Sequence, residues 1–241
     1  MVDHWRPMRS VQVVFFDAAG TLFRVRGSVG RIYADAARTF GIDTDPARLQ
    51  RAFVSSFHAA SARGFPEERS RDPALAERLW WMSVVREAFG AVMPEPVLPA
   101  YFDRVFELFR GADAWELFSD TRATLQDLRS RGLRLGVISN FDSRLFDVLA
   151  NLGVDSYFEQ VFISWRIGVA KPDVRIFRRA LEAMGIGPLQ AAHVGDSAAE
   201  DAEGALNAGL QAVLLDRTGA QRSPRGAATV RELAAIGPLL R

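Results

Sequence analysis

Five side chains along this 241-residue sequence could together bind and transfer a phosphoryl group. Asp17, Asp196 and Asp201 are carboxylates, Ser139 supplies a hydroxyl, and Lys171 supplies an ammonium. If the carboxylates gather in space, they form a hard oxygen site of the kind that binds Mg²⁺. An ammonium and a hydroxyl beside them could hold the phosphoryl oxygens. Because unpaired carboxylates repel one another, such a site requires a metal ion or the lysine to neutralise it.

Lys171 is also unusual in composition. It is the only lysine among the thirty basic side chains of the protein, and all the others are arginines. A lone lysine can mark a site that needs a compact ammonium rather than the planar fork of a guanidinium. Taken by itself, however, a single lysine is explained more simply by chance.

The composition excludes several classes of protein. Hydrophobic residues make up 49% and charged residues 24%, which is enough for a sizeable buried core. A net charge of +1 gives no strong attraction to nucleic acid or to a membrane surface. There are no cysteines, which excludes disulfides and thiolate ligands, and only three histidines. No apolar run reaches the ~18 residues of a membrane span, and residues 1–10 lack an apolar signal core, so we expect a cytoplasmic protein.

The elements that must position these side chains are visible as short apolar runs. Strands are expected at 11–16, 133–138, 161–164, 191–194 and 210–215. Helical patterns follow Asp120, Asp142 and Pro172-Asp173, and a fourth begins near residue 201. This alternation predicts an α/β fold, a Rossmann-like parallel sheet with helices on both faces. Ligands bind such sheets outside the carboxyl ends of the strands, where the candidate residues lie.

The stretch between residues 24 and 111 has a different pattern, with no convincing strand. Helices are expected at 28–40, 46–62, 73–89 and 98–110, separated by glycine and proline turns. We therefore expect an α/β core domain of residues 10–24 and 111–241, and a four-helix cap domain, 25–110, inserted after the first strand. The Gly-, Arg- and Ser-rich tail 218–228 predicts a loop before a short last helix.

Four motifs resemble, in this order, those of the haloacid dehalogenase (HAD) superfamily. They are Phe16-Asp17-Ala18-Ala19-Gly20-Thr21-Leu22, Val137-Ile138-Ser139-Asn140, Lys171-Pro172, and Val194-Gly195-Asp196 with Asp201. Each is a weak signal alone, but together they extend over residues 11–217 and are specific. The inserted helices resemble the C1 type of HAD cap. Finer features, such as Trp80-Trp81 and the segment 192–196, resemble one group of HAD-like hydrolase domain-containing proteins.

The resemblance implies roles in catalysis and substrate binding. Asp17 would be the nucleophile, forming an aspartyl intermediate that water then hydrolyses. Ser139 and Lys171 would hold the phosphoryl oxygens, and Lys171 would also bind Asp17. Thr21 and Asn140 would complete the substrate-binding set. The expected substrate is a small phosphate ester.

The resemblance also implies a Mg²⁺ cofactor. Asp17, Asp196 and the backbone carbonyl of Ala19 would ligate the ion, and Asp201 would support the metal or Lys171. HAD phosphatases carry a second aspartate, a general acid/base, where this chain has Ala19. Loss of such help typically costs about 10²–10⁴ in rate, so phosphatase turnover should be slow. Glu200 is one candidate replacement.

Three functions therefore stay open. The first is a slow Mg²⁺-dependent phosphohydrolase, and the second is a non-catalytic protein that keeps the phosphate and Mg²⁺ pocket. The third is a metal-independent 2-haloacid dehalogenase, in which Asp17 would attack carbon; these enzymes also lack the second aspartate, but they usually place a bulky residue there. We expect no nucleic-acid or membrane partner, and either a monomer or a homodimer.

Overall fold

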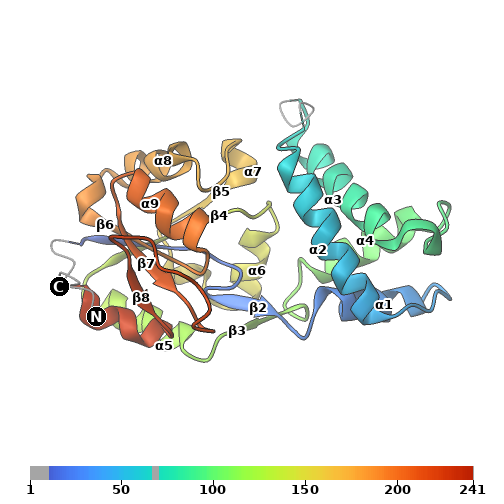
Figure 1. Cartoon of the computed structure of the whole chain (residues 1–241), viewed down its shortest axis with the longest axis horizontal. Helices are drawn as coiled ribbons and strands as arrows, with labels where there is room; N and C mark the ends of the chain where they lie inside the picture. Colours follow the sequence, from blue (N-terminus) through green and yellow to red (C-terminus); the bar gives the residue numbers. More distant parts are fainter. Residues whose placement is uncertain (1–10, 67–70, 241) are drawn as a thin grey trace. The chain divides into compact units, whose positions relative to one another are not determined.

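Six parallel strands form the central sheet, in the order β5-β4-β1-β6-β7-β8 (Figure 1). Their bounds are β1 Val13–Phe16, β4 Arg134–Ser139, β5 Gln160–Ile163, β6 Ala191–Gly195, β7 Gln211–Leu215 and β8 Ala228–Val230. This computed structural model describes residues 11–66 and 71–240. β1 pairs in parallel with both β4 and β6, so that Phe16 lies opposite Val137 and Val194. The predicted parallel α/β architecture is confirmed.

Helices cover both faces of this sheet, which is why all four residues of β1 are buried. One face carries α8 (Val174–Met184) and α9 (Gly204–Asn207), and the other carries α5 (Thr121–Ser130) and α6 (Leu145–Asn151) (Figure 1). Val13 and Phe15 of β1 pack with Ile176 and Phe177 of α8 in one apolar cluster. Such burial stabilises the sheet by about 1.5–3 kcal/mol for each large apolar side chain.

Side chains that begin and end helices follow the sequence prediction only in part. Asp173 accepts a hydrogen bond from the Arg175 N–H at the start of α8, and the helix ends at Gly185, as predicted. Asp120 is the N-cap residue of α5, as predicted, but its side chain makes no capping hydrogen bond. Asp142 lies two residues before Arg144, the N-cap residue of α6, and accepts its N–H at 2.9 Å. Arginine competes for both carboxylates: Arg217 binds Asp120, and Arg144 binds Asp142.

Residue contacts divide the chain into two compact units. One contains the residues up to Arg24 and those from Leu117 onward, and the other is Val25–Glu116. At the boundary, β2 (Phe23–Val25) pairs with β3 (Trp115–Leu117) in a two-stranded sheet. Neither strand is predicted by the sequence, because three residues are too few to show an alternating pattern. Residues 1–10 and 241, which include the outer bounds of the expected core domain and the segment without a signal core, lie outside the described residues.

The unit Val25–Glu116 is helical, as its sequence indicated. It contains α1 Val29–Arg38, α2 Pro46–Ala62, α3 Pro73–Phe89 and α4 Leu98–Leu108, with a 3-10 turn at Gly90–Val92. Aromatic rings fill its centre, where Tyr33 packs against Phe89 and Tyr101, and the Tyr101 hydroxyl donates to the Tyr33 carbonyl at 2.9 Å. Gly30 lets α1 approach α2, since a Cβ there would collide with the backbone of Gln50. In the described part of the chain, no helix is long and apolar enough to cross a membrane.

The chain after β7 contains the expected loop, which extends to residue 227, and the expected short last helix, but also a strand that the sequence did not predict. β8 adds a sixth strand, and a 3-10 helix, Leu233–Leu239, follows it. Asp120 connects this tail to the core, because its carboxylate accepts the Leu233 N–H at 2.7 Å as well as two bonds from Arg217. Arg217 also donates to the carbonyl of Thr21, which belongs to the first motif.

Asp120→Ala should therefore destabilise the protein measurably. It leaves the Arg217 guanidinium and the Leu233 N–H without their acceptor, and we expect a loss of about 2 kcal/mol in the free energy of unfolding. Urea denaturation monitored by circular dichroism measures it. The matched control is Asp127→Ala on the same helix, whose ion pair with Arg131 is exposed and should contribute less than about 0.5 kcal/mol. Equal losses in the two variants would contradict this account.

Candidate active site

The candidate site lies at the carboxyl ends of three neighbouring strands. Ser139 is the last residue of β4, Asp17 follows β1 directly, and Asp196 follows β6. Because β1 pairs with both of the other strands, these side chains meet at one edge of the sheet. The structure thus brings together residues that lie far apart in the sequence.

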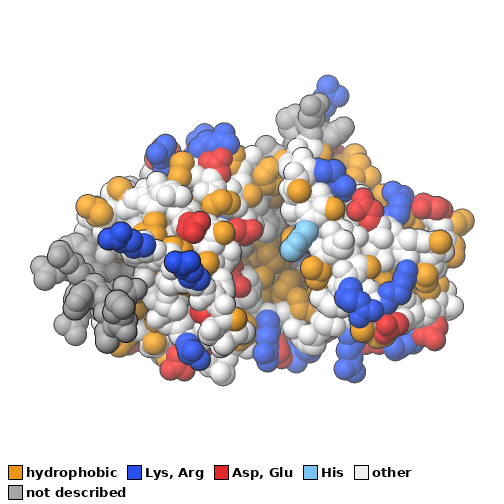
Figure 2. Space-filling view, viewed as in Figure 1, with side chains coloured by type: hydrophobic (Ala, Val, Ile, Leu, Met, Phe, Trp, Pro, Cys, Tyr) orange, Lys and Arg blue, Asp and Glu red, His pale blue; other side chains and the backbone are white. Residues whose placement is uncertain are grey.

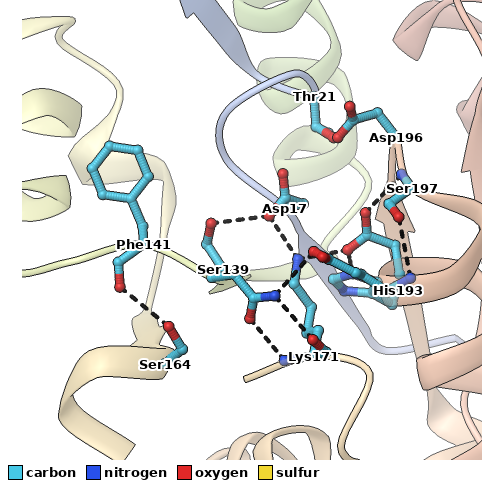
Figure 3. Close-up of polar contacts among 12 residues, drawn as sticks. Asp17, Thr21, Ser139, Phe141, Ser164, Lys171, His193, Asp196 and Ser197 are labelled. Carbon is cyan, nitrogen blue, oxygen red and sulfur yellow. Dashed lines mark hydrogen bonds and ion pairs between the residues drawn. The ribbon is translucent and has the colours of Figure 1, made fainter. Parts of the chain in front are cut away.

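Lys171 completes the group from the loop before α8. Its Nζ lies 2.6 Å from Asp17 Oδ1 and 2.5 Å from Asp201 Oδ1, and its side chain is 1% exposed (Figure 3). The Ser139 hydroxyl donates to the same Asp17 oxygen at 2.9 Å. Asp17 therefore lies between an ammonium and a hydroxyl, the two groups expected to bind a phosphoryl oxygen.

Asn140 holds the backbone of Lys171 from both sides. Its Oδ1 accepts the Lys171 N–H at 2.7 Å, and its Nδ2 donates to the Lys171 carbonyl at 3.0 Å. The same Nδ2 also donates to Glu200 at 2.9 Å. The amide of Asn140 is thus engaged in fixing the loop that carries the lysine, a geometry that the expected role in substrate binding did not anticipate.

Asp201 lies on a π-helix, Ala198–Glu203, directly after the Gly195-Asp196 pair. Its Oδ1 accepts bonds from Lys171 and from His193 Nε2, and its Oδ2 accepts the Ser197 N–H at 2.9 Å. Gly195 leaves room for this carboxylate, because a Cβ there would collide with it. Both oxygens of Asp201 are therefore occupied by donors of the protein.

Asp196 is oriented by the first motif and by the loop after β7. The fully buried Thr21 donates its hydroxyl to Asp196 Oδ1 at 3.2 Å (Figure 3). Gln221 donates to the Asp196 carbonyl at 2.6 Å. Gly20 has a φ of +94°, and a Cβ there would collide with the Asp196 carboxylate. The glycine of the first motif is thus required both by its backbone conformation and by this close approach.

Burial and mutual repulsion raise the pKa of two of these carboxyl groups. Burial raises the pKa of Asp17 above its ordinary value, despite the opposing effect of Lys171. Burial, together with the charges of Asp17 and Asp201, raises the pKa of Asp196 to about 7. The protein therefore stabilises the ionised forms of Asp17 and Asp196 only weakly.

Lys171 and Asp201 form the strong ion pair of the site. Burial by itself would lower the pKa of Lys171, but the carboxylates of Asp17 and Asp201 outweigh it and raise the pKa. Burial would likewise raise the pKa of Asp201, yet Lys171 and His193 hold it below its ordinary value. Both groups are charged across the physiological range.

The three carboxylates have the chemistry and spacing of a divalent cation site. One ligand atom from each of Asp17, Asp196 and Asp201 lies within 4.8 Å of the others. With Lys171 charged, three ionised carboxylates leave a net charge of −2, which a divalent cation would balance. Among the described residues, side-chain donors reach only Oδ1 of Asp17 and of Asp196, so their second oxygens are the better placed ligands.

His193 is a side chain of the site for which the sequence predicted no catalytic or binding role. The structure places this buried side chain against Asp201, with Nε2 2.8 Å from Oδ1. A polar residue inside an otherwise apolar strand was the available signal, since buried polar groups need partners. Ala19 lies in the turn after Asp17, partly exposed, and brings no acid to the site.

The fold is that of the HAD-like hydrolases, and the chain belongs to this family. The family model for haloacid dehalogenase-like hydrolases matches residues 11–209. Haloacid dehalogenase-like hydrolase domain-containing protein 3 of Mus musculus is 35% identical over 207 residues, covering 85% of this chain and 82% of the relative. The finer resemblance found in the sequence, to this group of proteins, is confirmed.

Other similar proteins differ in their named activities. Glyceraldehyde 3-phosphate phosphatase of Methanothermobacter thermautotrophicus is 31% identical over 211 residues, 86% of each chain. Two solved structures each have a TM-score of 0.70. One is a dehalogenase with an intermediate complex, 20% identical over 96% of this chain and 97% of that one. The other is a HAD-hydrolase from Bacillus subtilis bound to magnesium, 17% identical over 95% and 97%. Both show the fold alone.

Asp196→Asn should stabilise the metal-free protein at neutral pH. The pKa of Asp196 is about 7 in the folded chain against an ordinary 3.8, so its charge destabilises the fold increasingly between these two pH values and fully above pH 7. We expect the variant to gain on the order of 2 kcal/mol in unfolding free energy at pH 8 with a chelator. The gain should vanish near pH 4, which is the internal control. Denaturant titrations at both pH values test it, and an equal gain at pH 4 would contradict it.

Proposed function

We propose that this protein is a Mg²⁺-dependent phosphohydrolase that acts on a small phosphorylated metabolite through an aspartyl-phosphate on Asp17. The observation that carries the proposal is a buried carboxylate, Asp17, held between Lys171 and Ser139 and beside the poorly balanced Asp196. The relative named as a glyceraldehyde 3-phosphate phosphatase supports a phosphate ester as the substrate.

The residues suit a two-step reaction. The Asp17 carboxylate attacks phosphorus, the bond from phosphorus to the ester oxygen breaks, and the leaving group departs with its electron pair. Lys171 and Ser139, which bind Asp17 in the free protein, then donate to the phosphoryl oxygens as negative charge develops on them. In the second step water attacks phosphorus and releases a proton to the solvent. The bond from phosphorus to the Asp17 oxygen breaks, which frees the carboxylate and inorganic phosphate.

Asp17 and Asp196 would hold the Mg²⁺, with the Ala19 carbonyl as a further ligand. When bound, the ion supplies positive charge against the phosphoryl oxygens and relieves the repulsion between the carboxylates. Asp201 acts differently in this proposal, as the anchor of Lys171, because its oxygens already accept three bonds. Thr21 and Asn140 orient Asp196 and Lys171 through the bonds described above.

Ala19 limits which esters can react quickly. The methyl side chain of Ala19 cannot protonate a departing alkoxide, and the Glu200 carboxylate is already engaged by a hydrogen bond from Asn140. The reaction therefore favours leaving groups that depart without a proton, such as phenolates or carboxylates. Alkyl phosphates should react slowly, since general acid catalysis contributes about 10²–10⁴ in rate.

The two alternative functions make different demands on the site. A metal-independent 2-haloacid dehalogenase would have no use for Asp196, whose charge is already poorly balanced here. A non-catalytic phosphate-binding protein would keep the whole geometry and differ only in turnover. In either case the visible surface gives no support for nucleic-acid binding, because basic and acidic side chains are interspersed on it (Figure 2).

Two substitutions test the proposed roles of the nucleophile and the lysine. Asp17→Asn should abolish turnover of p-nitrophenyl phosphate in Mg²⁺ buffer. Lys171→Arg should reduce kcat by at least about tenfold despite the retained charge, because a guanidinium does not fit between Asp17 and Asp201. The matched control is Arg175→Lys, an exchange of the same two residue types at an exposed ion pair, which should leave the rate unchanged. If Lys171→Arg keeps more than half of the activity, the geometric role of the ammonium is wrong.

Restoring an acid at position 19 tests the missing proton shuttle. Ala19→Asp should raise kcat/KM for aryl phosphates by at least about tenfold, since a well-placed acid is worth roughly 10²–10⁴. The gain should grow as the leaving group becomes more basic, so a plot of log kcat/KM against leaving-group pKa should become less steep than in the wild type.

Ala19→Asn is the matched control, because it adds the same volume without a transferable proton. Its slope should stay that of the wild type. If Ala19→Asp folds, shows Mg²⁺-dependent thermal stabilisation and still gains nothing, a non-catalytic binding protein becomes the better interpretation.

A further inference from the structure

His193 is the part of the site that the proposed reaction does not use. It lies inside β6 with no exposed surface, and its Nε2 is 2.8 Å from Asp201 Oδ1. The same oxygen accepts the Lys171 ammonium at 2.5 Å, while the Ser197 N–H occupies the other oxygen (Figure 3). Of these three donors, only His193 comes from a strand of the sheet.

The hydrogen bond fixes which nitrogen of His193 carries the proton. Asp201 is ionised and can only accept, so Nε2 must be the donor. The imidazole packs edge-on against the Phe177 ring, with the two ring centroids 5.2 Å apart. Nδ1 is buried and has no hydrogen-bond partner within the described chain. A second proton there would be buried and unpaired. Burial accordingly lowers the pKa of His193, and the side chain is a neutral donor.

A neutral donor has a specific effect on a shared carboxylate oxygen. A cation at position 193 would compete with Lys171 for Asp201 and add a charge to a buried site. An apolar residue would leave Oδ1 to Lys171 alone, so the ammonium would bind Asp201 more strongly and Asp17 less. A neutral donor forms one hydrogen bond to Oδ1 of Asp201 and adds no charge. The positive charge of Lys171 then stays shared between Asp201 and Asp17.

We propose that His193 is a positioning residue, which sets the place of the Lys171 ammonium between Asp201 and Asp17 through its hydrogen bond to Asp201 Oδ1. The four side chains form one buried chain, His193–Asp201–Lys171–Asp17, with successive contacts of 2.8, 2.5 and 2.6 Å. His193 thereby acts on the nucleophile without touching it or the substrate.

The single lysine makes this position directly observable. Labelling with [¹⁵Nζ]lysine gives one side-chain signal, because Lys171 is the only lysine in the chain. His193→Leu should shift this signal and speed the exchange of its protons by about tenfold, the equivalent of one weakened hydrogen bond. His193→Gln, whose amide can donate from nearly the same place, should keep the wild-type signal and exchange rate.

The control for a general loss of stability is Leu181→Ala. It opens a cavity in the apolar cluster that also contains Phe177, with no polar contact to the site. It should lower the melting temperature but leave the lysine signal in place. If the lysine signal of His193→Leu differs from that of the wild type no more than the signal of Leu181→Ala does, the proposal is overturned.

The tautomer of His193 provides a test that needs no variant. The sequence contains three histidines, so ¹⁵N-labelled imidazoles can be resolved and assigned by NMR. Protonated Nε2 with bare Nδ1 at neutral pH supports the proposal. The reverse tautomer overturns it, even if His193→Leu fails to fold.

A kinetic measurement adds a readout that rests on the proposed function. His193→Leu should lower kcat for an aryl phosphate by about tenfold with KM nearly unchanged, and His193→Gln should restore it. Equal kcat values in folded wild type and His193→Leu count against the positioning role. If no phosphate ester is turned over by the wild type, that failure counts against the phosphohydrolase alone, and the NMR results still decide the role of His193.

Discussion

The buried ammonium of Lys171 is the interaction on which the rest of the site depends. A charge with 1% of its side chain exposed is tolerated only when it is paired and hydrogen-bonded, and here two carboxylates share it. Neighbouring residues hold this ion pair in place through hydrogen bonds. Asn140 binds the backbone of Lys171, and His193 and Ser197 bind the carboxylate of Asp201. Removing either carboxylate would leave a buried charge with half of its partners.

The parallel sheet makes this arrangement possible. Asp17, Ser139 and Asp196 come from three adjacent strands, and their positions follow from the register of β1 against β4 and β6. A slip of one residue would turn each side chain to the opposite face. The helical unit between β2 and β3 lengthens the chain between Asp17 and Ser139 without changing this register.

The charge of the site connects its structure with its proposed chemistry. Lys171 balances one carboxylate, and the raised pKa values of Asp17 and Asp196 show that the others are balanced incompletely. A Mg²⁺ ion would supply the missing positive charge. Ala19 removes one further carboxylate from this crowded edge, which lessens the repulsion but also removes the proton donor that alkyl esters need.

The sequence by itself determined the family, the parallel α/β architecture and most of the helices, because these depend on patterns of neighbouring residues. The expected bounds of α2 and α3 agree with the structure residue for residue. The order and spacing of the motifs also identified the residues that lie together at the carboxyl ends of the strands. Partners far apart in sequence decided the rest. The Asp120 carboxylate binds Arg217 instead of the first turn of its helix. Thr21 binds Asp196, Asn140 binds the backbone of Lys171, and His193 binds Asp201. Competition among donors for a carboxylate is settled only when the chain is folded, since a linear pattern does not contain the distances that decide it.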